Sequence, residues 1–264
     1  MAVELNLAGK NAIVCGSTQG IGKAVAIALA QMGASITLCA RNAEKLLQVQ
    51  AELPAKNGQR HFYIQADFTR PEELQQALQK HLQQHPQVHI LVNNTGGPAP
   101  GTAIDAATDA FELAFKAHLV CNQLLVQACV PSMKAAGFGR VINIISTSVK
   151  SPIPGLGVSN TIRGAVANWA KTLSTELGPF GVTVNNVLPG FTKTARLDAL
   201  IAKRAGEAGK PVPEYETYMQ QQIPARRYAS PEEIAAAVAY LSSPSAGFVN
   251  GINLPVDGGN TPSL

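Results

Sequence analysis

The chain has 264 residues, of which 46% are hydrophobic and only 14% are charged. This composition excludes an intrinsically disordered protein, because it supplies enough apolar side chains for a sheet that is buried on both faces. The formal net charge of +4 comes from lysines and arginines scattered along the chain. We therefore expect no nucleic-acid partner.

The first half of the chain alternates between strand-like and helix-like segments. The hydrophobic pattern predicts strands over residues 11–15, 35–40, 61–65 and 88–92, and helices over residues 21–31, 43–56 and 71–84. Such alternation is typical of parallel strands joined by right-handed crossovers, with helices on both faces of the sheet.

The second half continues this pattern around one irregular segment. We predict helices over 107–133, 158–177 and 231–241, with an irregularity near Pro131, and strands over 140–145, 182–188 and 251–254. Residues 191–228 carry three prolines among helical pieces, so we expect a lid over the carboxyl ends of the strands. No linker interrupts residues 1–264, which predicts a single domain.

The four cysteines lie in apolar segments and form no C-x-x-C pair: Cys15, Cys39, Cys121 and Cys129. We expect reduced core residues of a cytoplasmic protein without a secretory leader. The most apolar stretch, residues 24–32, is shorter than the ~20 residues that cross a membrane, so we expect no membrane span.

A glycine-rich turn separates the first predicted strand from the first predicted helix. It consists of Gly16, Ser17, Thr18, Gln19, Gly20, Ile21 and Gly22. Such a turn lets backbone N–H groups at a helix N-terminus bind a pyrophosphate, and its position between strand and helix makes the signal strong. We expect a doubly wound Rossmann fold of three α/β/α layers that binds a nicotinamide dinucleotide.

The end of the second predicted strand bears on the choice of cofactor. NAD pockets use a carboxylate there for the ribose 2′-hydroxyl, but this chain has Arg41 and Asn42 instead. An arginine binds a 2′-phosphate through charge-assisted hydrogen bonds, so we predict NADP(H) over NAD(H). The alternative is that Arg41 is a solvated charge at the start of the second helix.

Further motifs follow in the same order, namely Ala66-Asp67, Asn93-Asn94-Thr95-Gly96, Pro189-Gly190-x-x-x-Thr194 and Asp257-Gly258-Gly259. Together with the glycine turn they resemble the short-chain dehydrogenase/reductase family, including its 3-oxoacyl-carrier-protein reductases, over nearly the whole chain. The resemblance implies an adenine contact at Asp67 and Phe68, and cofactor support from Asn94, Thr95 and Gly96. It also implies a nicotinamide contact along Pro189, Gly190, Thr192 and Thr194, and a homotetramer or homodimer.

The catalytic positions depart from the family pattern. Family reductases use an asparagine, a serine and a Tyr-x-x-x-Lys motif, which is missing here. The resemblance places these residues at the four positions in chain order: His118, Ser146, Ser159 and Arg163. Ser159 and Arg163 still share one helix face, and Arg163 can hold the ribose hydroxyls. However, a serine hydroxyl is a far weaker acid than a tyrosine, so Ser159 does not simply replace it.

Several other groups are candidates for the proton donor. His118 is expected to titrate near neutral pH, and Lys150 follows the strand that carries Ser146. Tyr215 and Tyr218 lie in the expected lid. Each has a structural alternative, which is packing for His118 and the two tyrosines and a solvated loop position for Lys150.

The histidines at positions 81, 85 and 89 have a spacing that resembles a metal-binding face. Pro86 interrupts the helix, and no carboxylate or cysteine completes a ligand set. We expect no metal site and a solvated position for these histidines.

Two functions fit these features. The first is an NADP(H)-dependent oxidoreductase that reduces a carbonyl or a conjugated enone of a small molecule. Reduction of an enone suits the missing tyrosine, because it gives a delocalised enolate that solvent can protonate. The family's bacilysin-pathway reductase also lacks Tyr-x-x-x-Lys, and this chain partly resembles it in its Asn-Asn-x-x-Gly and Lys-x-Pro segments. The second function is a catalytically inactive NADP(H)-binding sensor or partner subunit.

Overall fold

The structure is a computed structural model that describes residues 3–56 and 58–263. Within that part of the chain, seven parallel strands form one sheet in the order β3-β2-β1-β4-β5-β6-β7. The strands are β1 (Asn11–Cys15), β2 (Ser35–Ala40), β3 (Phe62–Gln65), β4 (Ile90–Asn93), β5 (Gly139–Ile144), β6 (Val182–Pro189) and β7 (Asn253–Val256). The order reverses between β1 and β4, which creates a crevice at the carboxyl ends of these two strands.

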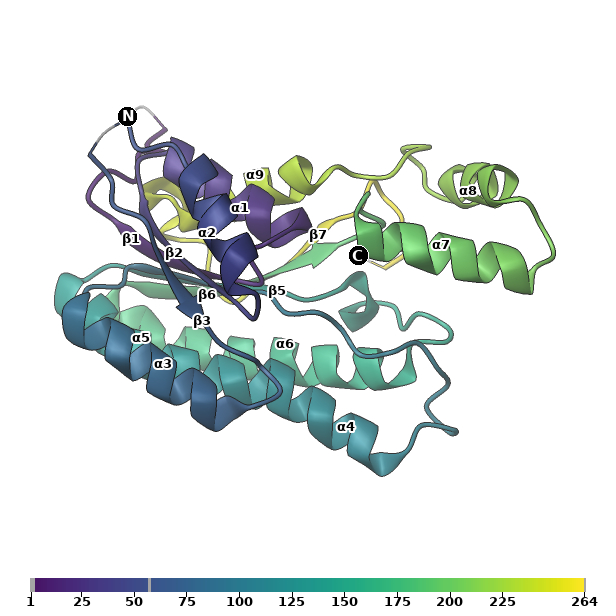
Figure 1. Cartoon of the computed structure of the whole chain (residues 1–264), viewed down its shortest axis with the longest axis horizontal. Coiled ribbons are helices and arrows are strands. Elements are labelled where there is room, and N and C mark those ends of the chain that lie inside the picture. Colours follow the sequence, from purple (N-terminus) through teal and green to yellow (C-terminus); the bar gives the residue numbers. More distant parts are fainter. Residues whose placement is uncertain (1–2, 57, 264) are drawn as a thin grey trace.

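Helices cover both faces of the sheet and give a three-layer molecule (Figure 1). They are α1 (Gly20–Gln31), α2 (Ala43–Glu52), α3 (Pro71–Gln84), α4 (Thr108–Phe115), α5 (Cys121–Ala136), α6 (Gly157–Leu177), α7 (Ala195–Glu207), α8 (Val212–Gln221) and α9 (Pro231–Ser242). Helices α1, α2 and α9 bury one hydrophobic cluster against the sheet, and α3, α5 and α6 bury another on the opposite face. The predicted doubly wound Rossmann fold is confirmed.

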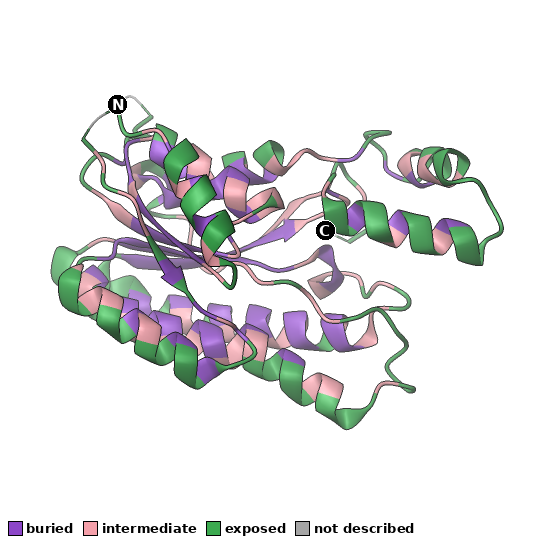
Figure 2. Cartoon of the chain, viewed as in Figure 1, coloured by how far each residue is buried: buried purple, intermediate pink, exposed green. Residues whose placement is uncertain are grey.

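The central strands are buried along almost their whole length, whereas the outer sides of the helices are exposed (Figure 2). This follows from their composition, because runs such as Ile90-Leu91-Val92 present apolar side chains to both faces. All four cysteines are buried and free, as the sequence predicts.

Several predicted element boundaries need correction. The helix predicted over 43–56 ends at Glu52, because Pro54 disfavours a helical conformation in the residue before it. The predicted irregularity near Pro131 is wrong, since α5 continues through Pro131 to Ala136. The irregularity lies earlier, in a π-helical turn over Lys116–Val120 that joins α4 to α5. A single π turn within an α-helix often marks a functional site.

The helical run Thr108–Ala136 is long and apolar enough to cross a membrane by length and composition alone. In this fold its second half covers the sheet, where Leu125, Cys129 and Met133 are fully buried. Core packing therefore explains the apolar side chains of this second half.

The prediction that the three histidines are solvated is wrong, because all three pack against neighbouring residues. The ring of His85 stacks on Phe62 at 3.9 Å between centroids, and His81 contacts both rings and the Thr37 hydroxyl. His89 is buried and its Nδ1 accepts a hydrogen bond from the backbone N–H of Asn11. Burial first, and then the neighbouring His85, lower the pKa of His81 to about 4.

Residues 191–228, here called the lid segment, project from the sheet layer and contain α7 and α8 (Figure 1). The two helices share a small hydrophobic cluster of their own, formed by Leu197, Ile201, Met219, Ile223 and Tyr228. That this segment closes over a substrate stays a prediction.

Four asparagines occupy matching positions on four adjacent strands, and we call them the asparagine ladder. They are Asn93 on β4, Asn143 on β5, Asn186 on β6 and Asn253 on β7. Each side-chain N–H donates to the side-chain oxygen of the next asparagine, at 2.8, 2.9 and 2.8 Å. The ladder joins these four strands through side chains as well as backbone.

Candidate functional site

The glycine turn lies at the carboxyl end of β1, where the strand order reverses. Gly16 and Gly20 adopt positive φ angles of 59° and 53°, which glycine tolerates and other residues rarely adopt. A Cβ atom on Gly22 would lie 2.1 Å from the carbonyl oxygen of Gly16. The turn therefore folds back on the start of α1 so tightly that only glycine fits at position 22.

The first turn of α1 is open to an anion. Its N-cap residue Gln19 makes no side-chain cap, and no acidic residue lies in the first turn. The unpaired N–H groups and the positive end of the helix dipole favour a negatively charged group there. This geometry fits a dinucleotide pyrophosphate, as the sequence predicts.

Two neighbouring segments hold this turn in place. The side-chain amide of Asn94 donates to the carbonyls of Cys15 and Gly16, and Ser17 accepts a hydrogen bond from the N–H of Cys39. Ser17 is fully buried, so its hydroxyl serves to hold β2 against the turn. Thr194 lies over the turn, where a Cβ on Gly20 would be 3.2 Å from its methyl group.

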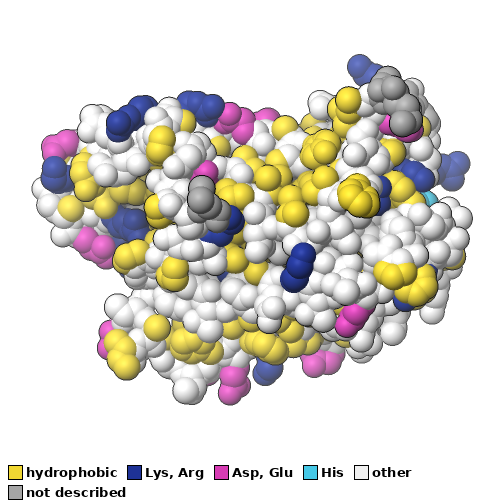
Figure 3. Space-filling model, turned by 180° about the vertical axis from the view of Figure 1, so that it is seen from behind, with side chains coloured by type: hydrophobic (Ala, Val, Ile, Leu, Met, Phe, Trp, Pro, Cys, Tyr) yellow, Lys and Arg dark blue, Asp and Glu magenta, His cyan; other side chains and the backbone are white. Residues whose placement is uncertain are grey.

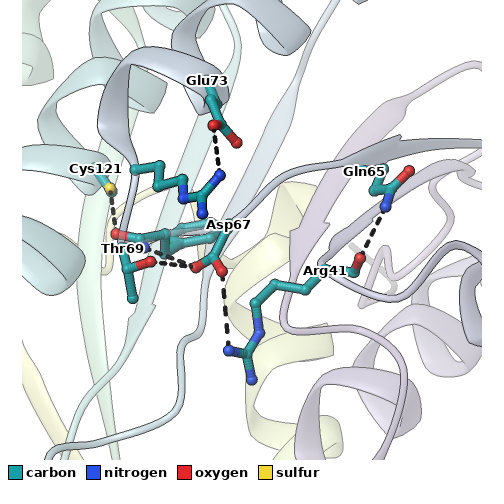
Figure 4. Close-up of polar contacts among 8 residues, drawn as sticks. Arg41, Gln65, Asp67, Thr69, Glu73 and Cys121 are labelled. Atoms are coloured by element: carbon teal, nitrogen blue, oxygen red, sulfur yellow. Dashed lines mark hydrogen bonds and ion pairs between the residues drawn. The ribbon is translucent and has the colours of Figure 1, made fainter.

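The adenosine end of the crevice carries a mixed charge pair (Figure 4). Arg41 is largely exposed and its Nη1 lies 3.9 Å from Oδ2 of Asp67. Asp67 accepts hydrogen bonds from the backbone N–H and the hydroxyl of Thr69, both at 2.9 Å. Burial alone would raise the pKa of Asp67, but these hydrogen bonds and the charges of Arg41 and Arg70 lower it, so the carboxylate is ionised at neutral pH. Asn42 caps α2 by accepting from the N–H of Lys45.

Phe68, the other residue assigned to the adenine end, is buried beside Asp67, and its carbonyl accepts a hydrogen bond from the Cys121 thiol. Its side chain belongs to the core cluster under α3 and α5. The backbone of Phe68 is thus fixed next to the carboxylate of Asp67.

Ser146 lies in a pocket of ≈ 310 Å³ at the carboxyl end of β5. The pocket is also lined by Pro189 and Gly190 after β6, by Phe191 of the lid segment, and by Asn260 and Thr261 near the C-terminus. The Ser146 hydroxyl accepts a hydrogen bond from the N–H of Ser148 at 3.1 Å, which fixes its position. The structure thus brings the predicted serine and the Pro-Gly segment together.

The C-terminal part of that pocket was not anticipated from sequence. Asp257 holds it, because its carboxylate accepts hydrogen bonds from the N–H groups of Gly259 and Thr261. A Cβ on Gly190 would lie 2.7 Å from the Cα of Asp257. The close approach requires glycine at position 190 and packs the Pro-Gly segment against the chain end.

His118 lies in the π-helical turn and is 3% exposed. Its Nδ1 is 2.6 Å from the hydroxyl of Thr95, so the helix and the loop after β4 are hydrogen-bonded together. Burial, followed by the positive charges of Arg163 and Arg196, lowers the pKa of His118 to about 3. The expectation that His118 titrates near neutral pH is therefore wrong, and the ring is neutral at pH 7.

Ser159 and Arg163 lie one turn apart on α6 and both are buried. Nη1 of Arg163 donates to the carbonyl of Ile144 at 3.1 Å, two residues before Ser146. Burial lowers the pKa of Arg163 to about 10, so it stays charged. Lys150 follows the short helix Thr147–Val149, outside the residues that line the Ser146 pocket.

The two lid tyrosines considered as donors lie on α8. The rings of Tyr215 and Tyr218 contact each other at 6.0 Å between centroids, and Tyr218 is 49% exposed. Tyr215 packs against the small hydrophobic cluster of the lid segment. In this conformation neither tyrosine lines the Ser146 pocket.

Comparison with known proteins agrees with this geometry. A family model described as enoyl-(acyl carrier protein) reductase matches residues 16–261. The chain belongs to the short-chain dehydrogenase/reductase family. An uncharacterized oxidoreductase of Mycobacterium tuberculosis is 33% identical to this short-chain dehydrogenase/reductase, over 96% of the chain and 92% of the relative.

Two solved structures of the family are similar over almost their whole length. L-sorbose reductase from Gluconobacter frateurii, complexed with NADPH and L-sorbose, has a TM-score of 0.92 at 29% identity, and the match covers 99% of this chain and 100% of that one. YwfH, an NADPH dependent reductase involved in bacilysin biosynthesis, has a TM-score of 0.91 at 28% identity, with 97% and 99% coverage.

Proposed function

We propose that this short-chain dehydrogenase/reductase is an NADP(H)-dependent reductase of a carbonyl or conjugated enone in a small molecule. The observation that carries the proposal is the crevice itself, where an open helix N-terminus, a glycine turn and the Ser146 pocket meet at the carboxyl ends of β1, β4 and β5. The family relatives that were solved with NADPH, or named as NADPH dependent, support the choice of cofactor.

The residues present fit such a cofactor along the whole crevice. The backbone of residues 16–22 suits the pyrophosphate, and Arg41 with Asn42 suits a 2′-phosphate. Asp67 and Phe68 lie at the adenine end of the crevice, and Arg163 suits the nicotinamide ribose. The middle of the cofactor would contact Asn94, Thr95 and Gly96. The nicotinamide would contact Pro189, Gly190, Thr192 and Thr194. The bound cofactor supplies the hydride.

Replacing Arg41 with alanine should change the cofactor preference. Loss of the guanidinium removes one charge-assisted contact with the 2′-phosphate, so we expect NADPH affinity to fall about 10-fold while NADH affinity stays the same. Fluorescence titration with both cofactors measures this change. Arg60→Ala, which removes a positive charge outside the crevice, is the control. Equal NADPH and NADH affinities in the unaltered protein, unchanged by the substitution, would refute the NADP(H) preference.

The residues of the crevice indicate which groups bind the substrate oxygen and which can supply the proton. The Ser146 hydroxyl is fixed in the pocket and donates a hydrogen bond to the substrate oxygen, where negative charge develops. Ser159 is too weak an acid to supply a proton at neutral pH, and neutral His118 is engaged with Thr95. Lys150 or solvent remains as the proton source. This favours an enone, because the enolate formed from it is delocalised and solvent can protonate it.

Replacing Ser146 with alanine should slow reduction about 100-fold, because one donor to the developing oxyanion is lost. Stopped-flow measurement of NADPH oxidation in a single turnover gives the rate, and NADPH affinity should not change. Ser148→Ala is the matched control, since it removes a buried hydroxyl that makes no hydrogen bond among the described residues. An unchanged rate would remove Ser146 from the mechanism.

A second candidate function is a catalytically inactive NADP(H)-binding sensor or partner subunit. The replacement of tyrosine and lysine by Ser159 and Arg163 favours it. A panel of ketones and enones discriminates between the two functions. NADPH oxidation with any of them supports the reductase, whereas tight NADPH binding without turnover across the panel supports the sensor.

A small molecule, rather than a polyanion, fits as the partner. On the face shown in Figure 3, lysines and arginines are scattered among acidic side chains. We also propose a homotetramer or homodimer that packs through the long helix, because Leu113 and Phe115 on α4 are 54% and 43% exposed. The four free, buried cysteines suit a cytoplasmic location.

A further inference from the structure

A group of basic side chains gathers where α7 meets the loop after β4. Arg163 is buried on α6, His118 is buried in the π-helical turn, and Arg196 lies in the first turn of α7. Arg196 is exposed and contacts Gly97 and Pro98, and His118 is hydrogen-bonded to Thr95 of the same loop. The charge of Arg196 also lowers the pKa of both His118 and Arg163. No acidic group offsets this effect at any of the three.

Arg196 reaches from the lid segment to the loop that follows β4. Its Nη2 donates to the carbonyl of Pro98 at 3.4 Å, and its guanidinium lies against Gly97. A Cβ on Gly97 would be 2.7 Å from both Nη atoms, so the glycine gives the guanidinium room. This single long hydrogen bond leaves most of the five N–H donors of Arg196 free.

The acidic side chains of the lid segment are engaged with other cations. Lys193 pairs with Asp198 and Glu216, Lys203 with Glu207, and Lys210 with Glu214. Within residues 3–56 and 58–263, neither Arg163 nor Arg196 has a carboxylate oxygen within 4.0 Å. Arg163 uses one of its donors, at the carbonyl of Ile144.

The guanidinium of Arg196 is held at Gly97 and Pro98 with most of its donors free and without a carboxylate partner among the described residues, so an anion beside it would supply the missing counter-charge. The phosphates of the cofactor have other partners, because the pyrophosphate fits the start of α1 and the 2′-phosphate fits Arg41. The residues that line the Ser146 pocket carry no charged side chain. A negative charge on the substrate would therefore find a partner at the Arg196 side of the crevice.

We propose that Arg196 binds the carboxylate of an acidic substrate such as a keto acid or an enone acid. Arginine suits this role, since its planar fork matches a carboxylate with two parallel hydrogen bonds. The carboxylate would also hold α7 against the loop at Gly97 and Pro98. This inference rests on the proposed reductase function, whose substrate class it narrows.

Matched acid and ester substrates test the inference. We expect NADPH oxidation with 3-benzoylacrylate to have a KM at least 10-fold below that of its methyl ester. Arg196→Ala should raise the KM for the acid by about 10- to 100-fold and leave the ester unchanged, and Arg196→Lys should lie between. Lys203→Ala, which removes one charge two turns further along α7, should change neither KM. Equal KM values for acid and ester would overturn the proposal.

A binding measurement separates this inference from the reductase proposal. Calorimetric titration of the protein saturated with NADP⁺ should show binding of 4-phenylbutyrate, weaker binding of 4-phenylbutyramide, and loss of the difference in Arg196→Ala. Equal binding of acid and amide would overturn the anion site even if enones are reduced. The anion site would also be overturned if Arg196→Ala lowered the affinity for NADPH as much as the affinity for 4-phenylbutyrate, because Arg196 would then hold the cofactor. Absence of turnover with any compound would instead count against the reductase.

Discussion

Replacing Gly22 with alanine is expected to lower NADPH affinity about 100-fold or more. The added Cβ would lie 2.1 Å from the carbonyl oxygen of Gly16 and 2.7 Å from the side-chain nitrogen of Asn94. The carbonyl belongs to the turn itself, so relief of this clash must move the backbone that presents N–H groups to the pyrophosphate. Overpacking of this kind costs about 3 kcal/mol, which corresponds to roughly 100-fold in affinity.

Fluorescence titration with NADPH measures this loss, and circular dichroism reports whether the fold is retained. Gly206→Ala is the matched control, because a Cβ at that position of α7 meets no atom within 4 Å. We expect that variant to bind NADPH as the unaltered protein does. NADPH affinity within twofold of normal in a folded Gly22→Ala protein would contradict the role assigned to the tight turn.

Asn143→Asp should destabilise the protein by about 3 kcal/mol at pH 7. Asn143 is fully buried, accepts from Asn93 and donates to Asn186 in the asparagine ladder. An aspartate has the same shape, but it sets a carboxylate oxygen against the side-chain oxygen of Asn186 and buries an unpaired charge. Burial raises the folded-state pKa of such a carboxyl above its unfolded value near 3.9.

The sign of the pH dependence follows from that shift. The folded variant holds its proton to higher pH than the unfolded chain, so the free energy of unfolding rises as the pH falls toward 4. Urea unfolding at pH 7 and pH 5 should therefore show a smaller deficit at pH 5. Asn253→Asp is the control, because Asn253 is only an acceptor in the ladder and is partly exposed. Equal destabilisation by the two substitutions would contradict the ladder's contribution.

The fold was predictable because its signals are local. A glycine turn between an apolar strand and an amphipathic helix indicates the Rossmann crevice wherever the other strands lie, and Pro71 begins α3 where the pattern predicts it. The π-helical turn at Lys116–Val120 was missed because no residue type specifies a π turn. Pro131 was a misleading marker, since α5 accommodates the loss of one backbone hydrogen bond.

The site was predictable only where residue types carry the chemistry. The family motif placed Ser146, and the structure puts it in a pocket with Pro189 and Gly190. The titration of His118 was not predictable, because its pKa depends on burial and on Arg163 and Arg196, which come 45 and 78 residues later in the chain. Arg196 itself stands in no motif, so only tertiary structure shows that its charge is uncompensated.

The asparagine ladder has a direction as well as a strength. Because each N–H meets the next oxygen, rotating the amide of Asn143 or Asn186 by 180° would oppose like atoms on both sides. The orientations of the four amides are therefore coupled, so the ladder has two alternative arrangements in which all four amides point the same way. In the observed state the oxygen left over is Oδ1 of Asn93, which makes no hydrogen bond to any described residue. The orientation of the ladder thus fixes the acceptor at the end of β4, and the next residue in the chain, Asn94, holds the glycine turn of the crevice.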